Sequence, residues 1–288
     1  MKEDLIDNLI KEVHILERVK IESYIIPYLD LRPVSQITIP AELPEGAEMG
    51  QKIDKNAKPM MSKLRSITDP RRKAVAIQAL KKFLGKNFEE IVEDSVTYRV
   101  HYKWADDMNL RNNRYQVRPT VHEIYFYKDR ESGRKLKKLM KERERLRMKA
   151  RRNPKPDLGG IQFAYPEEFD EKWILNMGKL LGYPECCSKR YAQDRINGIN
   201  VEARAANQLN EKINNDIPVD PHAYPLSYFF PCNPSCTNAI KLGLGWKEKL
   251  RGFDHRIASI YRDQIENNLK TVLKQPELIQ RYVNQVNT

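Results

Sequence analysis

The apolar positions of the N-terminal region predict helices separated by an irregular connection. In the first twenty-odd residues apolar side chains recur every three or four positions, which predicts an amphipathic helix; they are Leu5, Ile6, Leu9, Ile10, Val13 and Leu16. From residue 31 to about 57 the chain is rich in proline and glycine and is expected to be irregular. Asp69-Pro70 supplies an N-cap and a first-turn proline for a second helix, which Gly85 is expected to end.

A small sheet is predicted to follow these helices. Apolar and polar residues alternate over 96–102, and segment 121–127 is rich in β-branched and aromatic residues, so each is predicted to be a strand. The polar stretch 105–114 would connect the two strands as an antiparallel pair. Because a two-stranded sheet is marginally stable alone, we expect it to pack on the preceding helices.

From residue 169 onward the pattern is almost entirely helical. Apolar residues, among them Trp173, Met177 and Leu181, lie on one side of segment 169–181, and further helices are predicted at 184–196, 201–214, 235–250, 253–273 and 276–286. A proline-rich loop occupies 217–231. The predicted fold class is therefore α+β and mostly α-helical, with a small β element in the N-terminal half and a helical, cysteine-containing C-terminal domain.

Three regions are expected along the chain. Residues 1–127 form an N-terminal α+β region, 128–158 form a basic helical arm and linker, and 159–288 form the helical cysteine domain. The pair Gly159-Gly160, which follows the proline-containing end of the arm, gives the predicted domain boundary.

The charge of the chain is concentrated in the arm. The 288 residues carry a net charge of +12, and segment 128–152 holds thirteen basic and four acidic residues. A thin apolar stripe in this segment predicts a long exposed helix. Such a run favours phosphate contacts with little sequence preference, so RNA (tRNA or rRNA) is the predicted partner; a solvated helix or an acidic protein partner is the alternative. The predicted nucleic-acid contacts are Lys137, Lys138, Lys141, Arg143, Arg145, Arg147, Lys149, Arg151 and Arg152.

The apolar residues are too dispersed for a membrane protein. No window approaches the roughly 18 consecutive apolar residues of a spanning helix, and the N-terminus lacks the apolar core of a signal peptide. A cytoplasmic location without membrane contact is therefore expected. In a reducing compartment, clustered cysteines are more often metal ligands or catalytic thiols than disulfides.

The chain has four cysteines, in two tight pairs. Cys186 and Cys187 are adjacent, while Cys232 and Cys236 are separated by three residues. Both pairs are predicted at helix starts, where unpaired N–H groups and the helix dipole stabilise a thiolate. The two pairs are expected to meet and to act together as metal ligands, despite the chain that separates them.

The spacing of the pairs bears on which metal they hold. The second pair fits a zinc turn, whereas adjacent side chains such as those of the first pair are expected to diverge. A [4Fe–4S] cluster offers iron sites spread over a larger body, so an iron–sulfur cluster is the favoured prediction. Zinc is the alternative, and metal-free thiols, including simply buried ones, stay open.

The cysteine motifs resemble those of a known family. The sequence GYPECC, then His222 and Pro225, then PCNPSC followed by TNAIKLG is similar to the archaeal family of domain of unknown function 483. The likeness covers about 173–250; it implies an archaeal source and a shared cysteine site, and it carries no known activity. A weaker likeness to the cysteine-rich domain of heterodisulfide reductases supports cluster chemistry alone, because Ser188 here follows the doublet.

Two further residues are candidates for acid–base chemistry. His222 lies in the proline-rich loop ten residues before Cys232, and Glu185 immediately precedes the doublet, where a carboxylate more often compensates the helix dipole. His14, His101, His122 and His255 are expected to be structural or solvated. Glycine-rich phosphate loops and serine-nucleophile elbows are absent from the sequence, which disfavours ATP-dependent and serine-nucleophile chemistry.

Three functions remain open from the sequence. The favoured one is an iron–sulfur (or other metal) protein that acts on RNA, as a base- or sulfur-modifying enzyme. The second is a non-catalytic nucleic-acid- or ribosome-binding protein with a structural zinc. The third is a thiol redox or metal-handling protein whose basic helix contacts a protein partner.

Overall fold

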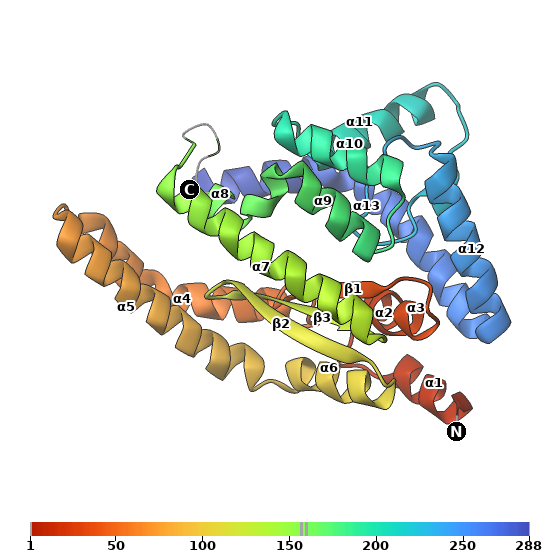
Figure 1. Cartoon of the computed structure of the whole chain (residues 1–288), viewed down its shortest axis with the longest axis horizontal. Helices are drawn as coiled ribbons and strands as arrows, with labels where there is room; N and C mark the ends of the chain where they lie inside the picture. Colours follow the sequence, from red (N-terminus) through yellow and green to blue (C-terminus); the bar gives the residue numbers. More distant parts are fainter. Residues whose placement is uncertain (1, 156–157, 159–160, 288) are drawn as a thin grey trace. The chain divides into compact units, whose positions relative to one another are not determined.

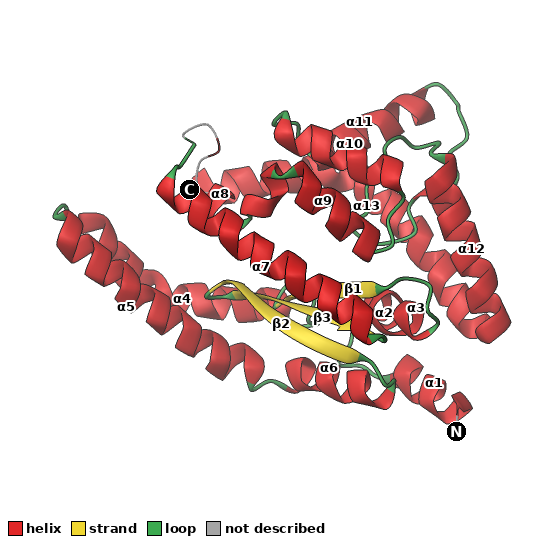
Figure 2. Cartoon of the chain, in the orientation of Figure 1, coloured by secondary structure: helices red, strands yellow, loops and turns green. Residues whose placement is uncertain are grey.

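The computed structural model describes residues 2–155, 158 and 161–287. The chain divides into two compact units, one of Met1–Asp30 and Val34–Asp129 and the other of Leu31–Pro33 and Arg130–Thr288 (Figure 1). The predicted boundary at Gly159-Gly160 lies outside the described residues, and the division between the compact units falls after Asp129. Helices dominate, and one small antiparallel sheet belongs to the first unit, so the predicted fold class is confirmed (Figure 2).

The first unit is helical outside its sheet. Its helical segments are α1 (Lys2–Lys11), α2 (Glu17–Val19), the π-helical η1 (Lys20–Ile25), α3 (Ile26–Tyr28), α4 (Gly46–Ser66), α5 (Pro70–Phe88), the π-helical η2 (Glu89–Glu93) and α6 (Val96–Asp107). The predicted cap of α5 is confirmed, because Asp69 accepts the backbone N–H of Arg72 at 2.7 Å. The predicted stop at Gly85 is wrong: the helix continues to the buried Phe88, whose burial outweighs the helix-breaking tendency of one glycine.

The sheet has three strands in the order β1-β3-β2. They are β1 (Val34–Ile39), β2 (Arg111–Arg118) and β3 (Val121–Tyr127), and both pairings are antiparallel. The central strand β3 was predicted, whereas β1 falls in the stretch expected to be irregular and β2 overlaps the expected connection. Ile37 and Ile124 are paired and fully buried, so the missed strand β1 is held by its apolar, β-branched face.

Segment 96–102 is helical, and its prediction as a strand is wrong. The Ser95 side chain caps α6 by accepting the N–H of Tyr98 at 3.1 Å, and the buried residues Thr97, His101 and Trp104 follow helical spacing. His101, expected on a solvated strand face, is fully buried and is hydrogen-bonded to the Tyr24 hydroxyl. Burial lowers the pKa of His101 to about 4, so this ring is neutral near pH 7.

The regular elements of the second unit are helices joined by loops, among its described residues. Its elements are α7 (Arg130–Arg152), α8 (Ile161–Ala164), the 3₁₀ turn η4 (Pro166–Phe169), α9 (Glu171–Leu180), α10 (Glu185–Ile196), α11 (Val201–Asn214), the 3₁₀ turn η5 (Pro221–Ala223), α12 (Thr237–Phe253) and α13 (His255–Asn287). The predictions for α9 to α12 are confirmed to within a few residues. The two helices predicted beyond residue 253 form one helix, α13, which contains Pro276.

Two glycines let the cysteine-bearing helices approach their neighbours. A Cβ at Gly178 of α9 would lie 2.2 Å from the Ser188 hydroxyl of α10, and a Cβ at Gly243 of α12 would lie 2.3 Å from the carbonyl oxygen of His222. A core cluster of α11, α13 and the loop before α12 buries Leu209 and Tyr224, among others. Close backbone approach and this core therefore fix the positions of α10, the loop and α12.

No helix among the described residues is long and apolar enough to cross a bilayer.

Candidate metal centre

The four cysteine thiols meet at one point in the second unit. Their sulfur atoms all lie within 4.8 Å of one another, with Sγ–Sγ distances of 3.6 Å from Cys236 to both Cys186 and Cys187 and 3.9 Å between the adjacent Cys186 and Cys187. The predicted meeting of the two pairs is confirmed. The expectation that adjacent side chains diverge is wrong here, since both thiols of the doublet face the same centre. Four thiols at these separations can hold a metal ion.

The first pair is positioned by a sharp turn between α9 and α10. Gly182 has φ of +74°, which side-chain-bearing residues rarely adopt, and Arg32 donates from Nε to the carbonyl oxygen of Leu181 at 3.1 Å. Pro184 then starts α10, because its carbonyl oxygen accepts the N–H groups of Cys187 and Ser188, each at 3.0 Å. The doublet therefore lies in the first turn of α10, as predicted.

The second pair is positioned by the turn that starts α12. Cys236 is the N-cap residue of α12, and its N–H donates to the carbonyl oxygen of Asn233 at 3.1 Å. The Asn233 side chain also accepts the N–H of Ser235 at 2.9 Å, which closes the turn. Cys232 thus lies in the loop, and Cys236 lies at the helix start.

The thiols of Cys186, Cys187 and Cys232 differ in the direction of their pKa shifts. Burial raises the pKa of Cys187 far above its ordinary value, and burial with the neighbouring Cys236 thiol raises the pKa of Cys232 to about 11. Although burial opposes it, hydrogen bonds from Asn238 and the neighbouring thiols hold the pKa of Cys186 below its ordinary value. Because like charges cannot collect in so small a buried space, four thiolates require a cation between them.

Two asparagine side chains donate to the sulfur atoms. Asn238 Nδ2 lies 3.5 Å from Cys186 Sγ, and Asn233 Nδ2 lies 3.5 Å from Cys232 Sγ. Donors of this kind stabilise metal-bound thiolates and orient them. Asn233 lies between the two cysteines of the second pair and Asn238 lies two residues after it, positions that could have singled them out.

The predicted acid–base candidates lie outside the four-thiol group. His222 is on η5, where its Nδ1 lies 2.7 Å from Asp220 Oδ1, and it is not among the clustered ligand atoms of the described residues. Glu185 is exposed and forms an ion pair with Lys189 at 2.6 Å, and the hydrogen bond from Lys189 lowers its pKa. The structure thus brings the four cysteines together without these two residues.

The basic helix α7 is not exposed all round. Of the predicted nucleic-acid contacts, seven are exposed and two, Arg143 and Arg147, are buried. Arg143 Nε lies 3.0 Å from Glu167 Oε1, and its guanidinium lies over the Trp173 ring. Arg147 contacts Glu144 and the carbonyl oxygen of Ala164. The predicted full exposure of this helix is therefore wrong at these two arginines, which hold α7 against η4, α8 and α9.

Part of the chain is similar to a known protein, and part of it matches a family model. A protein of Methanothermobacter thermautotrophicus, described as uncharacterized, is 37% identical over 82 residues, which are 28% of this chain and 39% of the relative. The chain thus matches well under half of that relative's length. No solved structure matches the chain. Residues 169–265, which include all four cysteines, match the family model described as "Protein of unknown function (DUF483)", and this confirms the resemblance that the cysteine motifs predicted.

Proposed function

We propose that the four cysteines bind a single zinc ion that fastens the start of α10 to the start of α12. The observation that carries this proposal is the set of Sγ–Sγ distances of 3.6, 3.6 and 3.9 Å. Four thiolates about 2.3 Å from one tetrahedral zinc ion lie about 3.8 Å apart along each edge. Cys186, Cys187 and Cys236 therefore stand near the separations that a single ion requires, and the Cys232 sulfur lies within 4.8 Å of theirs.

The same distances favour zinc over the predicted iron–sulfur cluster. In a [4Fe–4S] cluster each thiolate binds a different iron at a different corner, so the four sulfur atoms surround a much larger body. A group whose members all lie within 4.8 Å would have to spread apart to admit such a cluster. A zinc site with four protein ligands also keeps no open position for substrate, which favours a structural role.

Metal analysis of anaerobically purified protein tests the proposal. We expect colourless protein with about one zinc per chain, and cobalt substitution should give the intense thiolate-to-cobalt absorption of a tetrahedral site. Brown protein that contains iron and inorganic sulfide would refute the zinc site in favour of the cluster. Protein that takes up neither metal would refute the metal site and indicate that the four cysteines are free thiols.

A second proposal concerns RNA and rests on the exposed face of α7. Six exposed cations lie three or four positions apart and so share one face of the helix; they are Arg134, Lys138, Lys141, Arg145, Lys149 and Arg152. The buried residues Leu136, Met140, Arg143 and Arg147 lie on the opposite face. We name the six the cationic stripe. Its straight run of cations suits a phosphate backbone, which supports RNA as the partner.

Neutralising the cationic stripe should weaken RNA binding. A variant with Lys138→Gln, Lys141→Gln, Lys149→Gln and Arg152→Gln is expected to lose affinity, and its salt dependence should flatten by roughly one unit of slope for each phosphate that the helix no longer neutralises. Binding to a structured RNA would be measured over a range of salt concentrations. The matched control carries Lys241→Gln, Lys249→Gln, Arg251→Gln and Lys270→Gln, which remove the same charge at exposed positions of α12 and α13. Equal losses in the two variants would argue against the stripe.

A further inference from the structure

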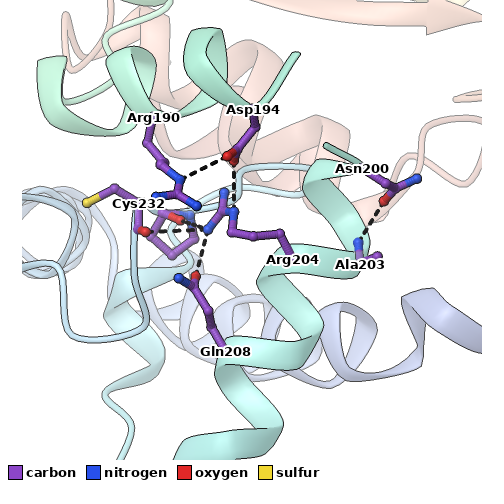
Figure 3. Close-up of polar contacts among 8 residues, drawn as sticks. Arg190, Asp194, Asn200, Ala203, Arg204, Gln208 and Cys232 are labelled. Carbon is purple, nitrogen blue, oxygen red and sulfur yellow. Dashed lines mark hydrogen bonds and ion pairs between the residues drawn. The ribbon is translucent and has the colours of Figure 1, made fainter. Parts of the chain in front are cut away.

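Arg204 of α11 reaches from its helix to the loop that carries Cys232. Its Nη1 donates to the carbonyl oxygen of Pro231 at 2.9 Å and lies 3.4 Å from that of Cys232, as Figure 3 shows. The same nitrogen donates to Gln208 Oε1 at 2.8 Å. The side chain is 8% exposed, so these bonds form in a largely dry environment where each is stronger than in water.

The loop that Arg204 contacts carries a cysteine of the metal centre. The carbonyl groups of Pro231 and Cys232 lie on either side of the Cys232 Cα atom, so their contacts with Arg204 restrain the backbone that presents the Cys232 sulfur. That sulfur lies within 4.8 Å of the other three. Because the guanidinium is largely buried, water screens its positive charge only weakly from the nearby thiols.

A second contact holds the Arg204 guanidinium in place. Asp194 of α10 is buried, and its Oδ2 accepts from Arg204 Nε at 2.9 Å, while its Oδ1 lies 2.9 Å from Arg190 Nε. Asp194 is on the helix whose first turn carries Cys186 and Cys187. The chain of contacts from Asp194 through Arg204 to the Cys232 loop thus links the helix of one cysteine pair to the loop of the other (Figure 3).

From these contacts we infer that Arg204 is a positioning residue of the metal centre. It fixes the Cys232 loop through the carbonyl oxygens of Pro231 and Cys232, and it joins that loop to α10 through Asp194. Four thiolates around one divalent cation carry two excess negative charges, and a buried charge of this kind needs donors and nearby cations. Arg204 supplies positive charge through the backbone of a ligand residue and not through a bond to its sulfur. This inference rests on the proposed metal site.

The test compares three variants for zinc affinity and for the spectrum of the cobalt-substituted protein. Arg204→Gln is expected to lower zinc affinity about 10- to 100-fold, the usual effect of losing an outer partner of a metal ligand. It should also shift the thiolate-to-cobalt charge-transfer band, because the loop that presents the Cys232 thiolate is held less firmly and a nearby positive charge is lost. Arg204→Lys keeps the charge and should recover part of the affinity. The matched control Arg190→Gln removes the other cation that pairs with Asp194, and it should change both readouts far less because Arg204 keeps its bonds to the loop.

The outcomes separate this inference from the proposal beneath it. Wild-type protein that binds no metal would overturn the metal site itself. Wild-type protein that binds zinc, with Arg204→Gln equal to it in affinity and cobalt spectrum, would overturn only the role of Arg204. If Arg204→Gln fails to fold, the Arg204→Lys variant provides the test. A zinc affinity and a thiolate-to-cobalt band equal to those of the wild type would then contradict a role for the guanidinium contacts.

Discussion

Replacing Cys236 by serine is expected to remove the bound metal and much of the stability of the second unit together. Cys236 is buried, and its sulfur lies 3.6 Å from those of both Cys186 and Cys187. A serine hydroxyl is a far weaker ligand for a soft metal site. Because metal binding stabilises only the folded chain, losing it should cost at least about 4 kcal/mol when the metal stands at a thousand times its dissociation constant. Metal content and thermal unfolding would be measured on the same samples.

Two controls accompany the Cys236→Ser variant. Ser235→Ala alters the exposed neighbour of Cys236 and leaves every thiol in place, so it should keep the metal and the melting temperature of the wild type. Wild-type protein stripped with a chelator should unfold like the Cys236→Ser variant. A variant that kept both its metal and its melting temperature would show that Cys236 is not a ligand.

Replacing Arg143 by alanine is expected to destabilise the second unit by about 3–5 kcal/mol, the usual result of leaving one member of a buried ion pair alone. Arg143 and Glu167 have side chains only 3% exposed each, and their ion pair joins α7 to η4. Equilibrium unfolding in urea would measure the change. The free energy of unfolding falls because the Glu167 carboxylate would lose its closest cation.

Arg145→Ala is the matched control for Arg143→Ala. Arg145 lies on the same helix and pairs with Glu142, but its side chain is 78% exposed, so its loss should cost under about 1 kcal/mol. If the two alanine variants were equally stable, the Arg143–Glu167 ion pair between α7 and η4 would not contribute to stability. The difference between the buried Arg143 and the exposed Arg145 also bears on RNA-binding experiments. An Arg143 variant would bind RNA less well because it unfolds. Its weaker binding would therefore not show that Arg143 contacts a phosphate.

Local signals explain which elements could be predicted. The helices from α9 to α12 combine apolar residues at helical spacing with caps such as Asp170, which accepts the N–H of Trp173. In segment 96–102 the apolar and polar residues fit both the alternation of a strand and the spacing of a helix. The cap at Ser95 and the burial of Trp104 favour the helix. Strand β1 needs β3 as its partner, which lies more than eighty residues away in the sequence. Pairing at that distance leaves little trace in a local pattern.

The candidate site was predictable in its ligands and not in its surroundings. Four cysteines in two pairs at helix starts were enough to expect one shared site. The choice of metal was harder, because it depends on whether Cys186 and Cys187 point to one centre, and backbone geometry decides that. Arg204 could not be found from the sequence, since two of its partners are backbone carbonyls that leave no sequence signal and a third, Asp194, lies on another helix. The burial of Arg143 could not be predicted either, because its partner Glu167 lies in another element.

The separation of the two cysteine pairs along the chain has a consequence for the segment between them. Cys186 and Cys236 are 50 positions apart, and α11, η5 and the proline-rich loop lie between them. A bound ion would close this stretch into a ring, which restricts the unfolded chain as a disulfide does and, in the chain-entropy model, stabilises the fold by about 4 kcal/mol. Helix α11 would then resist hydrogen exchange more strongly with the ion than without it, although its own residues supply no ligand. The metal would act on α11 as a removable cross-link between the two ends of its segment.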